Sequence, residues 1–409
     1  MSATPCRFCG ATVEAVFADL GMSPLANSYI SPDGANAMEP FYPLRTLVCG
    51  NCFLVQLEEF ESPERIFSDY AYFSSYSTSW IDHCRRYTEL MTERFGLDQQ
   101  SQVVEIASND GYLLQFFNES QIPVLGVEPA ANVAKVAVQK GIPTLVEFFG
   151  RQTASSIAAE SAADLLLGNN VLAHVPDLND FVAGMKILLK PTGVITMEFP
   201  HLMRLIEENQ WDTIYHEHFS YFSFSTASRV FEAHGLRLFD VEELPTHGGS
   251  LRIYGCHADS PRPEAQAAAQ LRERERIAGY DRIETYLDYG LRVQQDKRQI
   301  LRFLIDLKAS GLRVAGYGAP AKGNTLLNYC GIGRDFIDYT CDLNPHKQGC
   351  FLPGSHIPIQ APEAIRGDRP DVVLILPWNL KDEIVQQLDY MRDWGGRFAA
   401  RTPELTLLQ

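Results

Sequence analysis

The chain has 409 residues, of which 45% are hydrophobic and 21% charged, a composition typical of a globular protein with two or three domains. Its formal charge of -16 at pH 7 argues against nucleic acid or an acidic membrane as partners and favours small polar substrates, although a local basic pocket for a phosphate group is compatible with it. The first residues lack a secretory pattern, and no apolar run is long enough to cross a bilayer. We therefore expect a cytoplasmic protein, and we take it to be a monomer.

Residues 1–68 form the first predicted unit, a loop-rich segment with little apolar sequence for a core. It carries two C-x-x-C pairs, Cys6 with Cys9 and Cys49 with Cys52, each followed or split by glycine. Two such knuckles can supply four thiolates to a tetrahedral zinc ion, which would stabilise a small module. Redox chemistry and coincidental spacing are the alternatives. Because four protein ligands leave no open position, we expect a structural zinc.

The second predicted unit, residues 69–262, alternates short apolar runs with segments of helical length. The strand candidates are residues 102–106, 124–127, 163–167 and 193–199, and this alternation predicts a parallel, doubly wound α/β sheet. In such a sheet, ligands bind at the carboxyl ends of the strands. The residues that follow these strands are therefore the first candidates for a site.

A cofactor loop is predicted after the first of these strands, where small residues form a turn that leads into a helix. An acidic residue at the next strand end can accept both hydroxyls of a ribose, and polar residues after the third can close around the ligand. A nicotinamide enzyme would use much the same geometry, but the G-x-G-x-x-G turn that cradles a pyrophosphate is absent, which favours S-adenosylmethionine. A turn without a ligand is the other alternative. The candidate cofactor contacts are Glu105, Ala107, Ser108, Asn109, Gly111, Tyr112, Leu113, Glu128, Pro129, Asn169, Asn170 and His174.

Residues 211–222 hold the densest set of ionisable and aromatic side chains in the chain. A C–H proton beside a ketone is acidic enough for a positioned histidine, such as His218, to remove if a donor such as Tyr215 stabilises the enolate oxygen. Glu217 could orient the histidine or hold a substrate hydroxyl. A polar turn that contributes His247, Ser250 and Arg252 is expected to face the same cleft. A metal site at His216-x-His218 and a packed aromatic core are the competing interpretations.

The third predicted unit, residues 263–409, begins with long helices over residues 264–309 and continues as a second strand and helix alternation. Its strand candidates are residues 312–317, 336–341, 354–359 and 371–376. The loop at 316–324 combines a strand, a glycine turn, a lysine and a helix start, a pattern that suits a phosphate. Lys322 and Asn324 are the candidate substrate contacts there, and a close-packed turn without a ligand is the alternative.

These motifs, in this order, resemble the sugar C-methyltransferases of antibiotic deoxysugar pathways, which act on nucleotide-linked 4-keto-deoxysugars, commonly at C3. The resemblance runs along essentially the whole chain. It implies a small zinc-binding N-terminal module, a central doubly wound class I methyltransferase domain, and a C-terminal Rossmann-like α/β domain without nicotinamide that helps to hold the nucleotide sugar. The motifs that carry it are the paired C-x-x-C knuckles, Leu25-Ala26-Asn27, residues 72–77, 105–114, 215–218, 247–252 and 316–324.

The resemblance also assigns roles to single residues. His218 corresponds to the proposed base, Tyr215 and Glu217 fall on active-site positions, and Tyr72 and Tyr76 are candidates for an aromatic residue that reaches over from the N-terminal part. His216 is then structural. The implied activity is C-methylation of a keto sugar, expected to be dTDP-linked, through an enolate, with S-adenosylmethionine as cofactor and a structural zinc. An O- or N-methyltransferase and a non-catalytic scaffold that binds nucleotide sugars are the alternatives.

Overall fold

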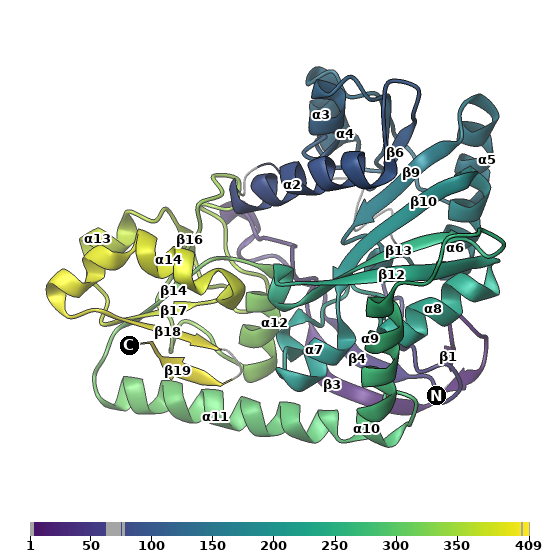
Figure 1. The fold of residues 1–409 in the computed structure, drawn as a ribbon. Helices are drawn as coiled ribbons and strands as arrows, with labels where there is room; N and C mark the ends of the chain where they lie inside the picture. Colours follow the sequence, from purple (N-terminus) through teal and green to yellow (C-terminus); the bar gives the residue numbers. More distant parts are fainter. Residues whose placement is uncertain (1–3, 63–74, 76–77, 402–403, 409) are drawn as a thin grey trace.

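The computed structural model describes residues 4–62, 75, 78–401 and 404–408. Tyr72 and Tyr76, which the resemblance placed near the site, lie outside the described residues. The described chain forms a small N-terminal module, a central α/β unit and a C-terminal α/β unit, with long helices between the last two (Figure 1). The predicted boundaries at residues 68 and 262 stay predictions.

The N-terminal module is built on a short antiparallel sheet that it shares with the central unit. Its strands are β3 (Ala15–Ser23), β4 (Tyr42–Val48) and β5 (Val55–Leu57), beside a hairpin of β1 (Thr4–Pro5) and β2 (Thr12–Val13). The fourth strand of the sheet, β11 (Ser220–Tyr221), comes from the central unit and pairs with β5. Since β11 directly follows His218, the sheet ties the module to the predicted catalytic segment.

The central sheet has seven strands, and their order along the chain is 3-2-1-4-5-7-6 from one edge to the other. The first five are parallel, and the strand inserted next to the fifth runs antiparallel to its neighbours. This is the doubly wound class I methyltransferase arrangement that the resemblance implied, so the predicted fold class is confirmed. From edge to edge the strands are β8 (Thr144–Leu145), β7 (Val124–Val127), β6 (Val103–Ile106), β9 (Ala163–Asn169), β10 (Leu189–Pro200), β13 (Ser250–His257) and β12 (Leu236–Leu244).

Helices cover both faces of this sheet because its strands are apolar on both sides. In β6, Val103 belongs to the core under one set of helices and Val104 to the core under the other, as the alternation of side chains along a strand requires. One face packs against α2 (Thr78–Phe95), α3 (Leu114–Glu119) and α4 (Ala131–Gln139). The opposite face packs against α5 (Arg151–Glu160), α6 (Leu178–Leu188) and α8 (Phe224–Ala233).

The C-terminal unit has a six-stranded sheet with the order 3-2-1-4-5-6, the order of dinucleotide-binding folds, with the last strand antiparallel. Two of the predicted strands are much shorter than expected, since residues 336–341 and 354–359 contribute only their last residues to strands. The strands are β16 (Ile359–Gln360), β15 (Thr340–Cys341), β14 (Val314–Tyr317), β17 (Val372–Ile375), β18 (Arg397–Arg401) and β19 (Leu405–Leu407). The helices are α12 (Ala321–Cys330), α13 (Ala364–Asp368) and α14 (Lys381–Gln387).

Long helices, together with a buried polar network around Arg401, fix the two α/β units relative to each other. The predicted helical connector consists of α9 (Gln266–Ile277), α10 (Glu284–Leu287) and α11 (Tyr289–Ala309), and a short α7 (Leu202–Glu207) follows β10 in the central unit. The α11 helix runs along the bottom of Figure 1. Its Tyr289 ring stacks on the Phe17 ring of β3, with the ring centroids 4.5 Å apart. None of the described helices has the length and apolar sequence needed to span a bilayer.

Candidate active site

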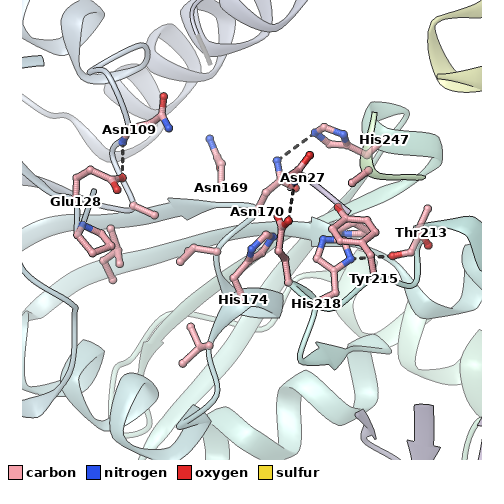
Figure 2. Close-up of a pocket in the computed structure, with 18 of the residues that line it drawn as sticks. Asn27, Asn109, Glu128, Asn169, Asn170, His174, Thr213, Tyr215, His218 and His247 are labelled. Atoms are coloured by element: carbon pink, nitrogen blue, oxygen red, sulfur yellow. Dashed lines mark hydrogen bonds between the residues drawn. The ribbon is translucent and has the colours of Figure 1, made fainter. Parts of the chain in front are cut away.

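A cavity of about 560 Å³ lies where the three units meet. The loops that follow β6, β7, β8 and β9 form one side, and the loops that follow β14 and β17 form the other. Among the described residues of the N-terminal module, Asn27 lines the cavity. Both sheets therefore turn the carboxyl ends of their strands toward one cavity, which is the position where open α/β sheets bind ligands. Figure 2 shows side chains that the central unit contributes to it.

The turn after β6 needs left-handed backbone at three positions, Ala107 (φ 58°), Asn109 (φ 49°) and Gly111 (φ 75°). The Glu128 carboxylate, at the end of the neighbouring strand, holds this turn by accepting the backbone N–H groups of Asn109 and Ala130, each at 2.9 Å. Each oxygen keeps a lone pair for a further donor. Burial raises the pKa of Glu128. Glu128 thus holds the strained turn after β6, and its carboxylate can still accept hydrogen bonds from two hydroxyl groups.

Two features of this side of the cavity fit S-adenosylmethionine. The Asn169 amide is directed into the pocket (Figure 2), and its Nδ2 is buried without a hydrogen-bond partner among the described residues. An unpartnered buried donor of this kind suits a carboxylate such as that of the methionine moiety. The free lone pairs of Glu128 suit the ribose hydroxyls. Ala107, Tyr112, Pro129, Asn170 and His174, also predicted as cofactor contacts, line the same cavity.

Four residues of the predicted cofactor loop lie behind the cavity wall. Leu113 is fully buried in a hydrophobic core, and Gly111 packs against Ile142 at the back of the turn. Ser108 is buried against Gly126, where an added Cβ would come within 2.3 Å of the Ser108 Oγ. Glu105 is fully buried within β6, where burial raises its pKa well above the usual range. In this structure these four residues shape the turn and do not line the cavity, and their contacts with the cofactor stay predictions.

Nothing in the sequence pattern singled out several other lining residues. Glu147, Phe148 and Phe149 follow β8, which is only two residues long and so leaves no strand signal in the sequence. Trp80 lies on α2, where an aromatic residue at helical spacing reads as core. Asn27, Lys347 and Asn379 lie in loops and meet the cavity only through tertiary contacts. Polar residues that follow a strand could be recognised from the sequence only where the strand itself was predicted.

His218 has a fixed tautomer. Its Nδ1 lies 2.9 Å from the Thr213 carbonyl oxygen, which can only accept, so Nδ1 carries the proton and Nε2 keeps its lone pair (Figure 2). Burial, followed by the nearby His174, lowers the pKa of His218 well below its usual range. A neutral imidazole with a free Nε2 is the form that can take a proton. Two roles were considered for Glu217, to orient the histidine or to hold a substrate hydroxyl. The Thr213 carbonyl oxygen, and not Glu217, orients His218.

Three more rings of the described chain lie around His218, and Tyr221 is the farthest, with ring centroids 5.9 Å apart. The Tyr215 ring lies 4.0 Å from the His218 ring with the planes tilted by 35°, and the His174 ring meets the edge of His218 at 4.8 Å. Burial lowers the pKa of His174 to about 4, so this neighbour is neutral at pH 7. His216 points away from the cavity toward the Pro43 carbonyl oxygen at 3.2 Å, consistent with a structural role. The only group of His, Cys, Asp and Glu that could hold a metal within the described ranges is the cysteine quartet.

Glu217 is bound from the N-terminal module. The Asn27 Nδ2 donates to its Oε1 at 2.7 Å (Figure 2), and both residues line the cavity. Burial raises the pKa of Glu217 to about 7. The carboxyl group therefore sits near its midpoint of ionisation at neutral pH and can accept or donate a hydrogen bond.

Two lysines of the C-terminal unit face this part of the cavity. The Lys322 Nζ donates to Asn379 Oδ1 at 2.7 Å and lies 4.5 Å above the Trp378 ring, and burial lowers its pKa to about 8. The Lys347 Nζ donates to the Ala319 carbonyl oxygen at 2.9 Å. Two cationic groups that share a pocket in a chain of net charge -16 form a local site for an anion.

The structure separates the other predicted substrate contacts. His247 lines the cavity, where its Nε2 accepts from the Asn170 amide at 3.1 Å. Ser250 and Arg252 are buried in β13, and the Arg252 guanidinium pairs with Glu198 at 3.2 Å, so neither lines the cavity. Asn324 is also buried and donates to the Ala26 carbonyl oxygen at 2.6 Å. In this structure these three residues serve packing and positioning, and their contacts with the substrate stay predictions.

The four cysteines of the N-terminal module converge on one point. Their sulfur atoms lie within 4.8 Å of one another, with Cys6 and Cys52 at 3.5 Å and Cys9 and Cys49 at 3.6 Å. Tetrahedral zinc with Zn–S bonds of about 2.3 Å needs S···S separations of roughly 3.8 Å. The residues therefore fit a structural zinc ion that binds Cys6, Cys9, Cys49 and Cys52.

The fold and the cavity define a class I methyltransferase with a zinc-binding module. Family models match all three parts, as a zinc-binding domain at residues 6–67, a methyltransferase domain at 80–241 and a C-methyltransferase C-terminal domain at 245–403. C-methyltransferase NovU of Streptomyces niveus is 37% identical over 400 residues, which cover 98% of this chain and 95% of NovU. The chain therefore belongs to the family of S-adenosylmethionine-dependent C-methyltransferases that includes NovU. The predicted family, enzyme class and cofactors are confirmed.

More distant similarities are confined to part of the chain. Ubiquinone biosynthesis O-methyltransferase of Rhodopseudomonas palustris strain BisA53 is 26% identical over 96 residues, or 23% of this chain and 38% of the relative. Magnesium protoporphyrin IX methyltransferase of Synechocystis PCC 6803 superposes on 43% of this chain and 79% of its own, with a TM-score of 0.34 and 10% identity. A methyltransferase of Anabaena variabilis covers 44% of this chain and 86% of its own, with a TM-score of 0.36 and 14% identity.

Proposed function

We propose that this C-methyltransferase acts on a nucleotide-linked 4-keto-deoxysugar, dTDP-linked and methylated at C3, beside the keto group. The observation that carries the proposal is His218, a neutral imidazole with a free Nε2, in a cavity that joins methyltransferase strand ends to two lysines of the C-terminal unit. An enolisable carbon needs such a base, and a nucleotide diphosphate needs the cations. The resemblance implies a role in antibiotic deoxysugar biosynthesis, and we assign the activity to a cytoplasmic monomer, as expected from the sequence.

The base is His218. Its Nε2 takes the proton from the carbon next to the ketone, the C–H electron pair becomes the new carbon–carbon π bond, and the carbonyl π pair moves to the oxygen. Tyr215, 4.0 Å from the His218 ring, is assigned to stabilise that oxygen. The low pKa of free His218 limits its basicity, but the enolate formed beside it stabilises the imidazolium. The positive imidazolium and the negative enolate thus form together, as an ion pair without net charge.

The phosphates of the acceptor are assigned to Lys322 and Lys347. Lys322 lies in the first turn of α12, whose N-terminus adds a partial positive charge. Glu217 is then left to hold a sugar hydroxyl. When bound, S-adenosylmethionine supplies an electrophilic methyl group on a positively charged sulfur, and the cavity wall holds the acceptor carbon in line with it and keeps water out.

The proposal is tested by offering the purified protein S-adenosylmethionine with matched acceptors. These are a dTDP-linked 4-keto-6-deoxysugar, the same keto sugar without its nucleotide, and the dTDP-linked 4-hydroxy sugar, with products identified by mass spectrometry and NMR. We expect one methyl group on C3 of the first acceptor and little turnover of the other two. Equal turnover of the free keto sugar, or a methyl group on oxygen, would contradict the proposal.

A further inference from the structure

We propose that Asn27, a residue of the zinc-binding module, is a positioning residue for Glu217 and thereby gives this module a direct part in acceptor binding. The inference rests on the proposed function, since it takes Glu217 as the residue that holds an acceptor hydroxyl. Asn27 ends the Leu25-Ala26-Asn27 motif, to which the resemblance attached no role in the site. It is the side chain that the N-terminal module contributes to the cavity wall within the described chain.

The contact between the two residues has one chemical direction. The Asn27 Nδ2 lies 2.7 Å from the Glu217 Oε1, and an amide nitrogen can only donate. A donor at this distance stabilises the ionised carboxylate and fixes its rotation, so that the other oxygen is presented to the cavity. Glu217 is only 3% exposed, so the orientation of its carboxyl group depends on the few polar groups around it.

The backbone of Asn27 is held on both sides by the C-terminal unit. The buried Asn324 amide donates to the Ala26 carbonyl oxygen at 2.6 Å, and the Tyr29 hydroxyl donates to the Ala319 carbonyl oxygen at 2.6 Å. Asn27 is therefore clamped between the C-terminal unit and Glu217 of the central unit. Asn324 lies at this junction of three units. This explains why it is buried away from the cavity although it belongs to the motif at 316–324, which suggested a substrate site.

The other charged groups near Glu217 give its ionised form little support. The hydrogen bond from Asn27 therefore largely decides whether the Glu217 carboxyl group is ionised. Lys347 is the cation that acts on Glu217, but it also pairs with Asp342 at 3.9 Å and lies over the Tyr29 ring. The flanking histidines, His216 and His218, have lowered pKa values and carry no charge at neutral pH. Because burial already raises the pKa of Glu217 to about 7, loss of the donor would leave the group protonated at neutral pH.

The first test compares Asn27→Ala and Asn27→Asp with Asn36→Ala, an exposed asparagine of the same module. We expect Asn27→Ala to raise the acceptor KM about tenfold, with a smaller change in kcat, and to move the acidic limb of kcat/KM upward by about one pH unit. Asn27→Asp should move it further, because two carboxyl groups then compete for protons. Zinc content and the Kd for S-adenosylmethionine should stay at wild-type values. Unchanged KM and pH profiles in both variants would overturn the inference.

A double-mutant cycle separates positioning from a general structural effect. In a Glu217→Gln background there is no carboxylate to stabilise, so Asn27→Ala should add less than a twofold change to the acceptor KM. An equal tenfold loss in both backgrounds would overturn the inference. Titration of ¹³C-labelled glutamate by NMR, with Glu217→Gln as the assignment control, gives the pKa of Glu217 without any turnover. An Asn27-dependent pKa in an enzyme that methylates no keto sugar would refute the proposed function and leave the coupling itself supported.

Discussion

Several titratable side chains of the cavity are shifted toward their neutral forms, and burial is the common cause. It lowers the pKa values of His174 and His247 to about 4 each, lowers that of Lys322 to about 8 and raises that of Glu217 to about 7. A site with few fixed charges suits an enolate, because the developing negative charge and a neutral base meet there in a low dielectric. Lys322 is then the group whose charge changes just above physiological pH.

Replacing Lys322 with methionine should weaken acceptor binding selectively. A charge-assisted bond to phosphate is worth about 1.5–3 kcal/mol, so we expect the acceptor KM to rise about ten- to hundredfold while the Kd for S-adenosylmethionine stays constant. The lysine is charged below its pKa of about 8, so the wild-type acceptor KM should rise as pH increases through 8, and the variant should lack this rise. Steady-state kinetics from pH 6.5 to 9.5 check both points. Lys135→Met, on the exposed face of α4, is the control, and a wild-type KM in Lys322→Met would contradict the assignment.

Much of the site could be predicted from single residues next to recognisable strands. His218, Tyr215 and Glu217 form a dense cluster, and Asn109, Glu128 and Asn169 follow apolar strands, so local pattern was sufficient to find them. Arg252 and Ser250 show the limit of that pattern. They read as a polar turn, but they lie in β13, a strand that was not predicted because its first residues continue the polar segment of residues 246–249. The contact of Asn27 with Glu217 joins residues 190 positions apart, which no local pattern contains. The Thr213 carbonyl is a backbone group, so the side-chain pattern did not point to it.

At the scale of elements, the zinc knuckle is docked onto the cofactor side of the cavity. Arg7, between Cys6 and Cys9, donates to the Pro176 carbonyl oxygen at 2.8 Å, and its guanidinium lies 5.4 Å from the ring of Phe219. The Asn179 amide binds the knuckle in return, through the carbonyl oxygens of Arg7 and Phe8. Since Pro176 lines the cavity in the loop after β9 and Phe219 follows His218, the knuckle supports both that loop and the base.

Arg7→Met should therefore weaken cofactor binding without loss of the metal. All four cysteines remain, so zinc content by atomic emission should stay near one per chain, while calorimetry should show a roughly tenfold higher Kd for S-adenosylmethionine, the cost of one charged hydrogen bond. Arg45→Met, at a more exposed arginine of the same module, should change neither. Removal of zinc by a chelator should abolish binding, because the module loses the ion that holds its knuckles. An unaltered cofactor Kd in both Arg7→Met and zinc-free protein would contradict the coupling.

Elements were predictable in proportion to their length and apolarity. The inner parallel strands and the helices over residues 264–309 have strong periodic patterns, and the structure contains them. The strands β8, β15 and β16 have two residues each, so β8 was not predicted and the other two were predicted as longer strands. The shared sheet formed by β5 and β11 joins residues far apart in the chain, so the sequence offered no sign of it.

At the scale of the whole molecule, the active site exists because two sheets face each other, and a buried network holds them there. The Arg401 guanidinium pairs with Asp212 at 2.9 Å and with Asp296 at 2.8 Å. Trp378, next to the lysines, donates to Asp212 at 2.7 Å. A Cβ at Gly248 (φ 92°) would come within 2.3 Å of the Trp378 ring, so this close contact requires glycine. The network spans β18, α11 and the turn that precedes the catalytic segment.

Arg401→Met should be among the most destabilising substitutions at a site remote from the chemistry. It leaves two buried carboxylates unpaired, and breaking a buried ion pair from one side costs about 3–5 kcal/mol. Chemical denaturation should show that loss, and kcat should fall as the two cavity walls separate. Arg392→Met, which breaks only a solvent-exposed pair, should change stability by less than about 0.5 kcal/mol. If Arg401→Met were as stable as Arg392→Met, the network would not be what holds the units together.

The most direct test of the account is solvent exchange at the acceptor carbon. The dTDP-linked 4-keto-6-deoxysugar is incubated in deuterated water with S-adenosylhomocysteine, so that proton abstraction proceeds without methyl transfer, and NMR follows deuterium at C3. We predict exchange with the wild-type protein and with His216→Gln, whose side chain faces away from the cavity, and a loss of at least about a hundredfold in His218→Gln. Exchange and methylation at wild-type rates in His218→Gln would contradict the account.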